Sequence, residues 1–291
     1  MKVLILGISG LIGHNIYMQL SDRVNVIGTL HKTKDEYANT EIFSNKNVYD
    51  NIDMSNYTLL KKMFKEENPD VIVNCVGITR RKIHNYDMDE VIYINSTLPH
   101  LLAKWSIGQN KRIIHFSTDC VFDGVEGNYL ETSHTNAFDI YGKTKALGEL
   151  SQNNCLTIRS SFIGQELFDK TELLDWFLSQ DGQEINGYTK ALYSGVSTIY
   201  LARLVNKIIM DYPKLTGLFN LAPIKPISKY DLLSLAKEVF SVDVSIRPDD
   251  TFVHNPTLNG SKLHREIGIK VPSWDIMMHE LASNRNVYDT K

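Results

Sequence analysis

Short apolar runs alternate with amphipathic stretches through the first half of the chain. Helical periodicity falls near residues 12–21, 56–67, 90–107 and 141–152. Between these stretches lie five runs of mostly hydrophobic residues: Val3–Leu6, Val24–Gly28, Val71–Val76, Arg112–Ser117 and Leu156–Arg159. Strands that are apolar on both faces are typical of a parallel sheet that helices cover on both sides. The alternation predicts an α/β fold built on a Rossmann-type, doubly wound parallel sheet.

The rhythm loosens after about residue 160. Residues 219–240 predict a short strand, a proline-rich turn and a helix that Ser228 caps. In the first half, Asn56 or Ser55 is expected to cap the helix near 56–67, and Pro69 follows its end.

We expect two parts in the chain. Residues 1–160 form a Rossmann-type domain that also receives elements near 187–210. Residues 161–291 form mainly a smaller C-terminal lobe that would bind a substrate. Such a lobe would cover the carboxyl ends of the strands, where open α/β sheets bind ligands.

Composition narrows the possible classes of protein. The net charge of -3 over 291 residues argues against a general nucleic-acid binder. No apolar stretch is long enough to span a bilayer, so no membrane association is expected. The cysteines Cys75, Cys120 and Cys155 are odd in number and widely spaced, which fits a reducing cytoplasm better than a disulfide framework or a zinc site. The histidines show no ligand spacing either, so no metal is predicted.

The sequence GISGLIG stands between the first strand and the first helix. It places Gly7, Gly10 and Gly13 around Leu11 and Ile12. Glycines let a pyrophosphate approach the backbone, and the start of the helix supplies N–H groups. The spacing differs from the commoner GxGxxG, and three glycines can also make a purely structural turn. The position of the turn favours a dinucleotide site.

The end of the second strand carries His31 and Lys32 where a carboxylate would hold the ribose of NAD. Cations there suit a 2′-phosphate, so NADP(H) is the preferred cofactor and NAD(H) remains possible. Two solvated loop residues are the alternative. Asp53, at the end of an expected third strand, and Met54 are candidates for the adenine edge. Three residues at the end of the fourth strand could line the dinucleotide: Cys75, Val76 and Gly77.

Tyr141 and Lys145 lie four residues apart on a predicted helix and therefore share a face. A nearby ammonium stabilises a phenolate and so lowers the pKa of a tyrosine. Thr118 or Ser117, after the preceding strand, could hold a substrate oxygen. Most tyrosine–lysine pairs at this spacing are surface residues. Combined with the amino-terminal glycines, the pair becomes specific.

With these motifs the chain resembles the extended short-chain dehydrogenase/reductases, and more narrowly the dTDP-4-dehydrorhamnose reductase family. The resemblance rests on GISGLIG, the STD-VFDG frame around Cys120, YGKTKALGE, TIRSSFIG (157–164) and ISKYDLL. It implies that residues 1–160 bind NAD(P) and that the lobe of residues 161–291 binds a sugar nucleotide. It also implies reduction of the 4-keto group of a nucleotide-diphosphate sugar by NAD(P)H, as in dTDP-rhamnose biosynthesis. Relatives suggest a homodimer. The catalytic residues implied by position are Thr118, Tyr141 and Lys145. Ser117, Tyr141 and Lys145 would contact the cofactor, and Asn95 would complete a water relay to the lysine.

Cys120 stands where this family usually has tyrosine. GDP-fucose synthases and the plant-type bifunctional rhamnose synthases look similar here and carry a cysteine that epimerises carbons beside the ketone. Cys120 is therefore either such an acid–base, with Lys170 as a loosely aligned partner, or a small apolar filler. A bifunctional 3,5-epimerase/4-reductase is one alternative function, and a 4,6-dehydratase or 4-epimerase is another.

A third alternative is non-catalytic. The regulatory subunit of methionine adenosyltransferase resembles these reductases, and a relative of that kind would bind NADP and a partner protein. Two further features stay open at this point. Arg80, Arg81 and Lys82 could meet a pyrophosphate or form a solvated basic turn. Arg159 stands where the family has its own arginine before the active-site loop, and it could simply satisfy backbone carbonyls there.

Overall fold

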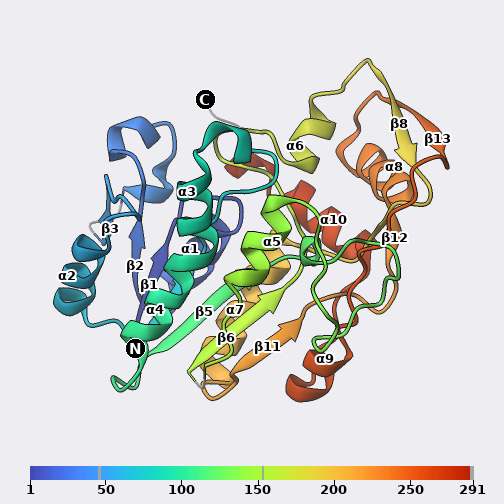
Figure 1. Ribbon diagram of the computed structural model, residues 1–291. Coiled ribbons are helices and arrows are strands. Elements are labelled where there is room, and N and C mark those ends of the chain that lie inside the picture. The colour runs from blue at the N-terminus through green and yellow to red at the C-terminus, as the bar shows by residue number, and fades with distance from the viewer. Residues whose placement is uncertain (45–46, 153, 289–291) are drawn as a thin grey trace.

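The computed structural model describes residues 1–44, 47–152 and 154–288. Within these ranges seven strands form one sheet in the order β11-β6-β5-β4-β1-β2-β3, and every neighbouring pair is parallel (Figure 1). The strands are β1 (Lys2–Leu6), β2 (Asn25–Thr29), β3 (Val48–Tyr49), β4 (Val71–Asn74), β5 (Arg112–Ser117), β6 (Cys155–Arg159) and β11 (Gly217–Asn220). The predicted doubly wound parallel sheet is confirmed.

Helices cover both faces of the sheet. Val3 and Ile5 of β1 pack in a cluster with α1 (Gly13–Ser21) and α7 (Thr198–Asp211). Leu4 and Leu6 point to the opposite face, where they join α2 (Tyr57–Glu67) and α4 (Leu98–Ser106). Alternate side chains of one strand are buried on opposite faces, which explains why the strands are continuously apolar.

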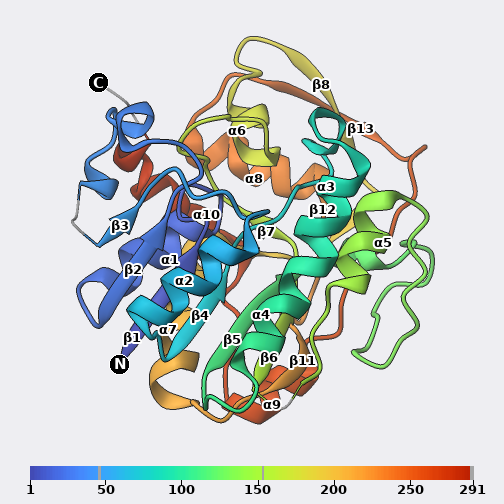
Figure 2. The same ribbon diagram turned by 60° about the vertical axis from the view of Figure 1, so that its left-hand side comes forward.

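The helix expected near 90–107 has three parts. It runs from α3 (Met88–Ile92) through a π-helical turn, η4 (Tyr93–Thr97), into α4. Figure 2 shows α3 and α4 in line, with α5 (Ile140–Leu147) beside them. Turns of this kind often mark functional sites, and Asn95 lies at the centre of this one.

Three details differ from the expectations. The third strand is Val48–Tyr49, so Asp53 follows it in a loop instead of ending it. The helix expected to reach residue 152 ends at Leu147, because Gly148 packs against the π turn and a side chain there would lie 2.0 Å from the Asn95 carbonyl oxygen. The strand expected at the start of 219–240 belongs to the central sheet as β11.

The expected cap residues can be read from the structure. Asn56 is the cap of α2, since its side chain accepts a hydrogen bond from the Leu59 N–H. Ser228 caps α8 (Lys229–Phe240) in the same way through Asp231.

Much of the rest of the second half, including α6, α8, β8 and β13, lies beyond the carboxyl ends of the central strands, whereas α9 lies alongside β11 (Figure 1). Short strand pairs join β7 with β10, β9 with β12 and β8 with β13. These strands are β7 (Phe162–Ile163), β8 (Glu184–Tyr188), β9 (Leu192–Tyr193), β10 (Val196–Ser197), β12 (Ile227–Ser228) and β13 (Ser245–Asp249). The accompanying helices are α6 (Leu173–Leu178), α8, α9 (Ser261–Ile267) and α10 (Trp274–Ser283). No helix in the described ranges is both long and apolar enough to cross a membrane.

Candidate active site

The glycine turn connects β1 to α1 with very little space inside it. Gly7 has a φ of +79°, and a Cβ at Gly13 would lie 2.1 Å from the Gly7 carbonyl oxygen. Gly10, in contrast, is exposed, and a Cβ there would meet only the Gly7 oxygen at 3.6 Å. Leu11 and Ile12 follow it, partly exposed, at the start of α1. An open backbone at a helix start fits a dinucleotide pyrophosphate.

The segments that follow β2 and β3 run side by side near this turn. Backbone bonds run from Asn51 N to the Lys32 carbonyl (3.0 Å) and from Ile52 N to the Leu30 carbonyl (2.9 Å). The segment that carries Asp53 and Met54 therefore lies along the end of β2, where His31 and Lys32 are exposed. The Lys32 ammonium is 3.7 Å from a Glu36 carboxylate oxygen in a solvent-exposed pair. The structure thus brings the four residues that were predicted for the adenosine half of the cofactor to the end of β2: His31, Lys32, Asp53 and Met54.

The end of β4 leads to the centre of the site. A Cβ built on Gly7 would lie 2.9 Å from a methyl group of Val76, and one on Gly77 would lie 3.6 Å from Asn95 Oδ1 and 3.9 Å from Lys145 Nζ. Asn95 exchanges two hydrogen bonds with the Ile78 backbone, at 2.9 and 3.0 Å. The Asn95 side-chain amide thus fixes the loop after β4. The water relay from Asn95 to Lys145 stays a prediction.

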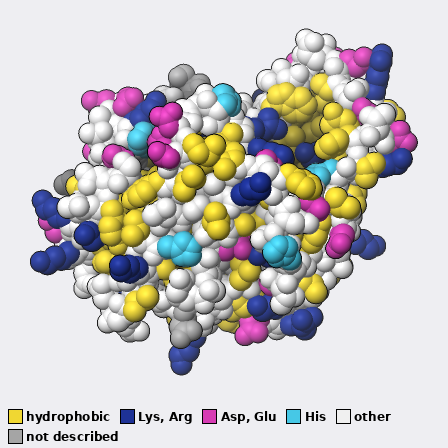
Figure 3. All heavy atoms as spheres, viewed as in Figure 1, with side chains coloured by type: hydrophobic (Ala, Val, Ile, Leu, Met, Phe, Trp, Pro, Cys, Tyr) yellow, Lys and Arg dark blue, Asp and Glu magenta, His cyan; other side chains and the backbone are white. Residues whose placement is uncertain are grey.

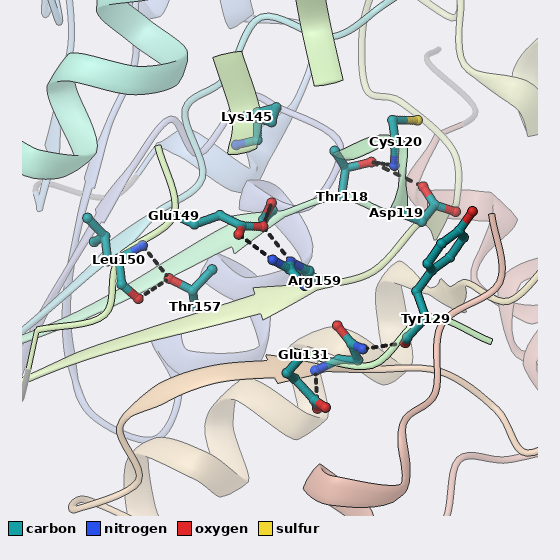
Figure 4. Close-up of polar contacts among 12 residues, drawn as sticks. Thr118, Asp119, Cys120, Tyr129, Glu131, Lys145, Glu149, Leu150, Thr157 and Arg159 are labelled. Carbon is teal, nitrogen blue, oxygen red and sulfur yellow. Dashed lines mark hydrogen bonds and ion pairs between the residues drawn. The ribbon is translucent and has the colours of Figure 1, made fainter. Parts of the chain in front are cut away.

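The STDC sequence, residues 117–120, forms a tight turn at the end of β5. The Thr118 hydroxyl accepts a bond from Cys120 N (3.1 Å) and donates to an Asp119 carboxylate oxygen (3.1 Å) (Figure 4). Thr118 and Asp119 are buried, and Cys120 is half-buried. Gly142 of α5 packs on this turn, because a Cβ there would lie 2.1 Å from the Cys120 carbonyl oxygen.

Helix α5 carries Tyr141 and Lys145 into the site. Asp139 caps it by accepting from Gly142 N (2.9 Å). The Lys145 ammonium is buried and donates to the Phe116 carbonyl oxygen at 2.7 Å, and burial lowers the pKa of Lys145 to about 8. Burial, with the nearby Cys120, raises the pKa of the Tyr141 phenol, and Thr118 acts against that rise. Tyr141 therefore holds its proton at neutral pH, as a proton donor must.

The side chain of Ser117 is turned away from this site. Its hydroxyl donates to Glu149 Oε1 at 2.7 Å. Glu149 also receives two bonds of 2.6 Å from Arg159, whose side chain is only 3% exposed (Figure 4). Arg159 thus pairs with a carboxylate, and the expectation that it satisfies backbone carbonyls is wrong. Sequence reasoning missed Glu149, although it ends the YGKTKALGE motif.

Burial, followed by the charge of Asp119, raises the pKa of the Cys120 thiol to about 12. A thiol in such surroundings is protonated at neutral pH and is a poor base. Lys170 does not reach it, because that residue is exposed with a φ of +51°, and its charge acts on Asp175. The contacts favour a packing role for Cys120.

The basic turn after β4 makes ion pairs on three sides. Arg80 lies 2.6 Å from Asp139, Arg81 lies 3.6 Å from Glu172, and Lys82 lies 3.1 Å from Glu166 and 2.6 Å from Asp169. These pairs tie the turn to α5 and to the segment before α6. All three basic residues of this turn are therefore paired with carboxylates, and the turn is not simply solvated.

Sequence reasoning also missed Lys229, the first residue of α8. Its ammonium forms no hydrogen bond or ion pair with any residue that the structure describes. Burial lowers the pKa of Lys229, while the charge of Asp119 and the Cys120 thiol act in the opposite direction. The Lys229 ammonium thus lies within electrostatic reach of Asp119 and Cys120. Figure 3 shows the surface hollowed between the central body and the part that carries β8 and β13, with hydrophobic and basic side chains around it.

No cluster of histidine, cysteine or acidic side chains suited to a metal ion occurs in the described ranges. His254, one of the histidines considered above, packs against Gly124 beside the site.

A family model described as "RmlD substrate binding domain" matches residues 1–186, which is more than half of the chain. The chain belongs to this family. The motifs that carry the resemblance up to residue 164 all lie within the matched segment.

Two curated relatives align over nearly the full length. The dTDP-4-dehydrorhamnose reductase of Escherichia coli is 25% identical over 97% of this chain and 98% of its own length. The methionine adenosyltransferase 2 subunit beta of Xenopus tropicalis is 24% identical over 95% of this chain and 88% of its own length.

Two solved structures share the fold. A dTDP-4-dehydrorhamnose reductase from Bacillus anthracis in complex with NADP has a TM-score of 0.78 at 19% identity, over 96% of this chain and 98% of that one. The Bordetella bronchiseptica enzyme WbmG in complex with NAD and UDP has a TM-score of 0.79 at 17% identity, over 99% of this chain and 96% of that one.

The buried pair generates a first prediction. Glu149→Gln leaves the Arg159 guanidinium buried without its counter-charge, which should lower the free energy of unfolding by about 3–5 kcal/mol. Urea denaturation measures this. As a control, Asp250→Asn breaks the exposed Lys190–Asp250 pair and should change stability little. Equal effects of the two changes would contradict the importance of the buried pair.

Proposed function

We propose that the protein is an NAD(P)H-dependent oxidoreductase that reduces the 4-keto group of a nucleotide-linked deoxysugar. The observation that carries the proposal is the convergence of Thr118, Tyr141 and Lys145 beside the open glycine turn. A Cβ built on Gly77 would lie 3.6 Å from Asn95 Oδ1 and 3.9 Å from Lys145 Nζ, so the loop after β4 links the glycine turn to the side of the site that carries Lys145. The match to dTDP-4-dehydrorhamnose reductases supports the same reaction.

The chain would use its own groups around the hydride transfer. When bound, the nicotinamide supplies the hydride that adds to sugar C4. The Tyr141 phenol donates its proton to the C4 oxygen, so that ketone, hydride and proton give an alcohol. The Lys145 ammonium stabilises the phenolate that Tyr141 becomes, and Thr118 orients the ketone. A positioned proton donor is typically worth about a hundred- to ten-thousand-fold in rate.

The preferred cofactor is NADP(H), with NAD(H) possible. His31 and Lys32 at the end of β2 would face a 2′-phosphate, and only the exposed Glu36 offsets Lys32. One structural neighbour holds NADP and another holds NAD.

Calorimetric titration measures this preference. NADPH should bind more tightly than NADH, and changing His31 and Lys32 together to Ala should narrow the difference. Equal affinities in the unchanged protein would contradict the assignment.

The substrate would be a nucleotide-diphosphate sugar in the hollow between the two parts. Lys229 is a cation without a partner among the described residues, which suits an anionic group. WbmG, which shares the fold, was crystallised with UDP. A cytoplasmic location and a homodimer stay predictions. The raised pKa of the Cys120 thiol disfavours a role as a base, and with it the epimerase alternative. Cys120 would instead pack beside the substrate.

A regulatory protein without catalysis is the second candidate, because methionine adenosyltransferase 2 subunit beta aligns over 95% of the chain. Turnover separates the two functions. A regulatory relative would bind the dinucleotide yet reduce no 4-keto sugar nucleotide.

Tyr141→Phe tests the proton donor. The change removes one hydroxyl and little volume, so kcat for reduction should fall on the order of a hundred-fold or more while dinucleotide binding stays nearly constant. Steady-state kinetics and a binding titration on the same preparation measure both. Near-normal turnover would remove Tyr141 from the mechanism.

Lys145 generates a pH prediction. Its pKa is lowered from 10.5 to about 8, so the ammonium is present below that pH and is lost above it. Tyr141, whose pKa is raised, keeps its proton through the same range. The kcat/KM for reduction should therefore fall above about pH 8, since this ratio reports groups of the free enzyme. A ratio that stays level to about pH 10 would show that the charge on Lys145 is not required.

A further inference from the structure

Tyr193 enters the site from β9, in the second half of the chain. Its side chain is 8% exposed, and its buried hydroxyl bonds no residue that the structure describes. Gly195 makes room for it, because a Cβ there would lie 2.5 Å from the Tyr193 hydroxyl oxygen. The Trp274 ring packs beside it at 5.5 Å between centroids. Buried hydroxyls are nearly always bonded, so this one requires an explanation.

The contacts of β9 place Tyr193 beside the turn that follows β5. Ser194 Oγ accepts a hydrogen bond from Leu258 N at 3.0 Å, and Leu258 packs in one cluster with Val121 and Phe122. Ala191 forms a bridge with His254, which packs on Gly124. After burial, the charges of Asp119, Glu172 and Cys120 raise the pKa of the Tyr193 phenol, and the same three groups act on that of Tyr141. The catalytic scheme uses only Tyr141.

The backbone around Tyr193 connects it to Lys229. β9 pairs with β12, which leads directly into α8, and the Lys229 N–H bonds the Ala191 carbonyl oxygen at 2.9 Å. The charge of Asp119 and the Cys120 thiol act on the Lys229 ammonium. The pairing of β9 with β12 thus holds Tyr193 and the unpaired ammonium in neighbouring segments.

We propose that Tyr193 is a specificity-determining residue whose phenol binds an oxygen substituent of the sugar ring close to the carbon that is reduced. The inference rests on the proposed function and extends it to the sugar. A protonated phenol can both donate and accept, so it suits a ring hydroxyl. The hydrogen bond to the sugar would satisfy a hydroxyl that has no partner among the described residues. Recognition of the sugar would therefore explain why this buried hydroxyl is left unbonded.

The test compares Tyr193→Phe with Tyr212→Phe. Tyr212 is a matched control, since its hydroxyl donates to the Ile267 carbonyl oxygen at 2.9 Å on a different part of the molecule. Calorimetry with NADP+ present measures binding of UDP, dTDP, GDP and CDP and of their glucose conjugates. The oxidised cofactor prevents reduction during the titration, and thermal unfolding of each variant without ligand supplies the second measurement.

Tyr193→Phe should weaken binding of the preferred nucleotide sugar about tenfold, the loss expected for one buried hydrogen bond. It should leave the matching nucleoside diphosphate unaffected and should not lower the unfolding midpoint. Tyr212→Phe should lower the midpoint and leave binding unchanged.

Three results would overturn the inference. Equal affinity of the parent and Tyr193→Phe for the nucleotide sugar would remove Tyr193 from recognition and leave the proposed function standing. A drop in midpoint for Tyr193→Phe as large as that for Tyr212→Phe would show that the hydroxyl is structural. A parent protein that binds no nucleotide sugar would overturn both the inference and the proposed function.

Discussion

The hydrogen bond from the Lys145 ammonium to the Phe116 carbonyl oxygen is the interaction on which the rest of the site depends. It joins α5 to the carboxyl end of β5 at 2.7 Å. This close approach relies on two glycines that lie against backbone carbonyls, Gly142 of α5 on Cys120 and Gly148, directly after α5, on Asn95. A side chain at either position would push the helix away and carry Tyr141 out of reach of Thr118.

Burial has opposite effects on the two groups that are proposed to be catalytic. It lowers the pKa of Lys145 to about 8 and raises that of Tyr141, because a low-dielectric site disfavours the charged form of each. At neutral pH α5 thus carries a protonated phenol and, one helical turn further along, a cation. The Glu149–Arg159 pair lies next to this arrangement, and Glu149 raises the pKa of Lys145 against the effect of burial.

The fold and the local motifs could be predicted because their signals are short in sequence. Continuous apolar runs predict a two-faced sheet, and a glycine turn or a tyrosine and lysine four residues apart need only neighbouring residues. What sequence reasoning missed depends on long-range packing. Arg159, at the end of β6, pairs with Glu149, which lies just after α5. β11 pairs with β6 in the central sheet, although it comes much later in the sequence. Tyr193 and Lys229 come together only through the pairing of β9 with β12 in the second half of the chain.

Hydride transfer to the sugar is the central claim, and isotope transfer tests it most directly. The protein would be incubated with a 4-keto-6-deoxy nucleotide sugar and NADPH that carries deuterium on the transferred position of the nicotinamide. The account predicts consumption of the cofactor together with one deuterium on C4 of the sugar, observed by NMR and mass spectrometry. Tight binding of NADPH with no deuterium in any sugar product, across the four nucleotides, would contradict it.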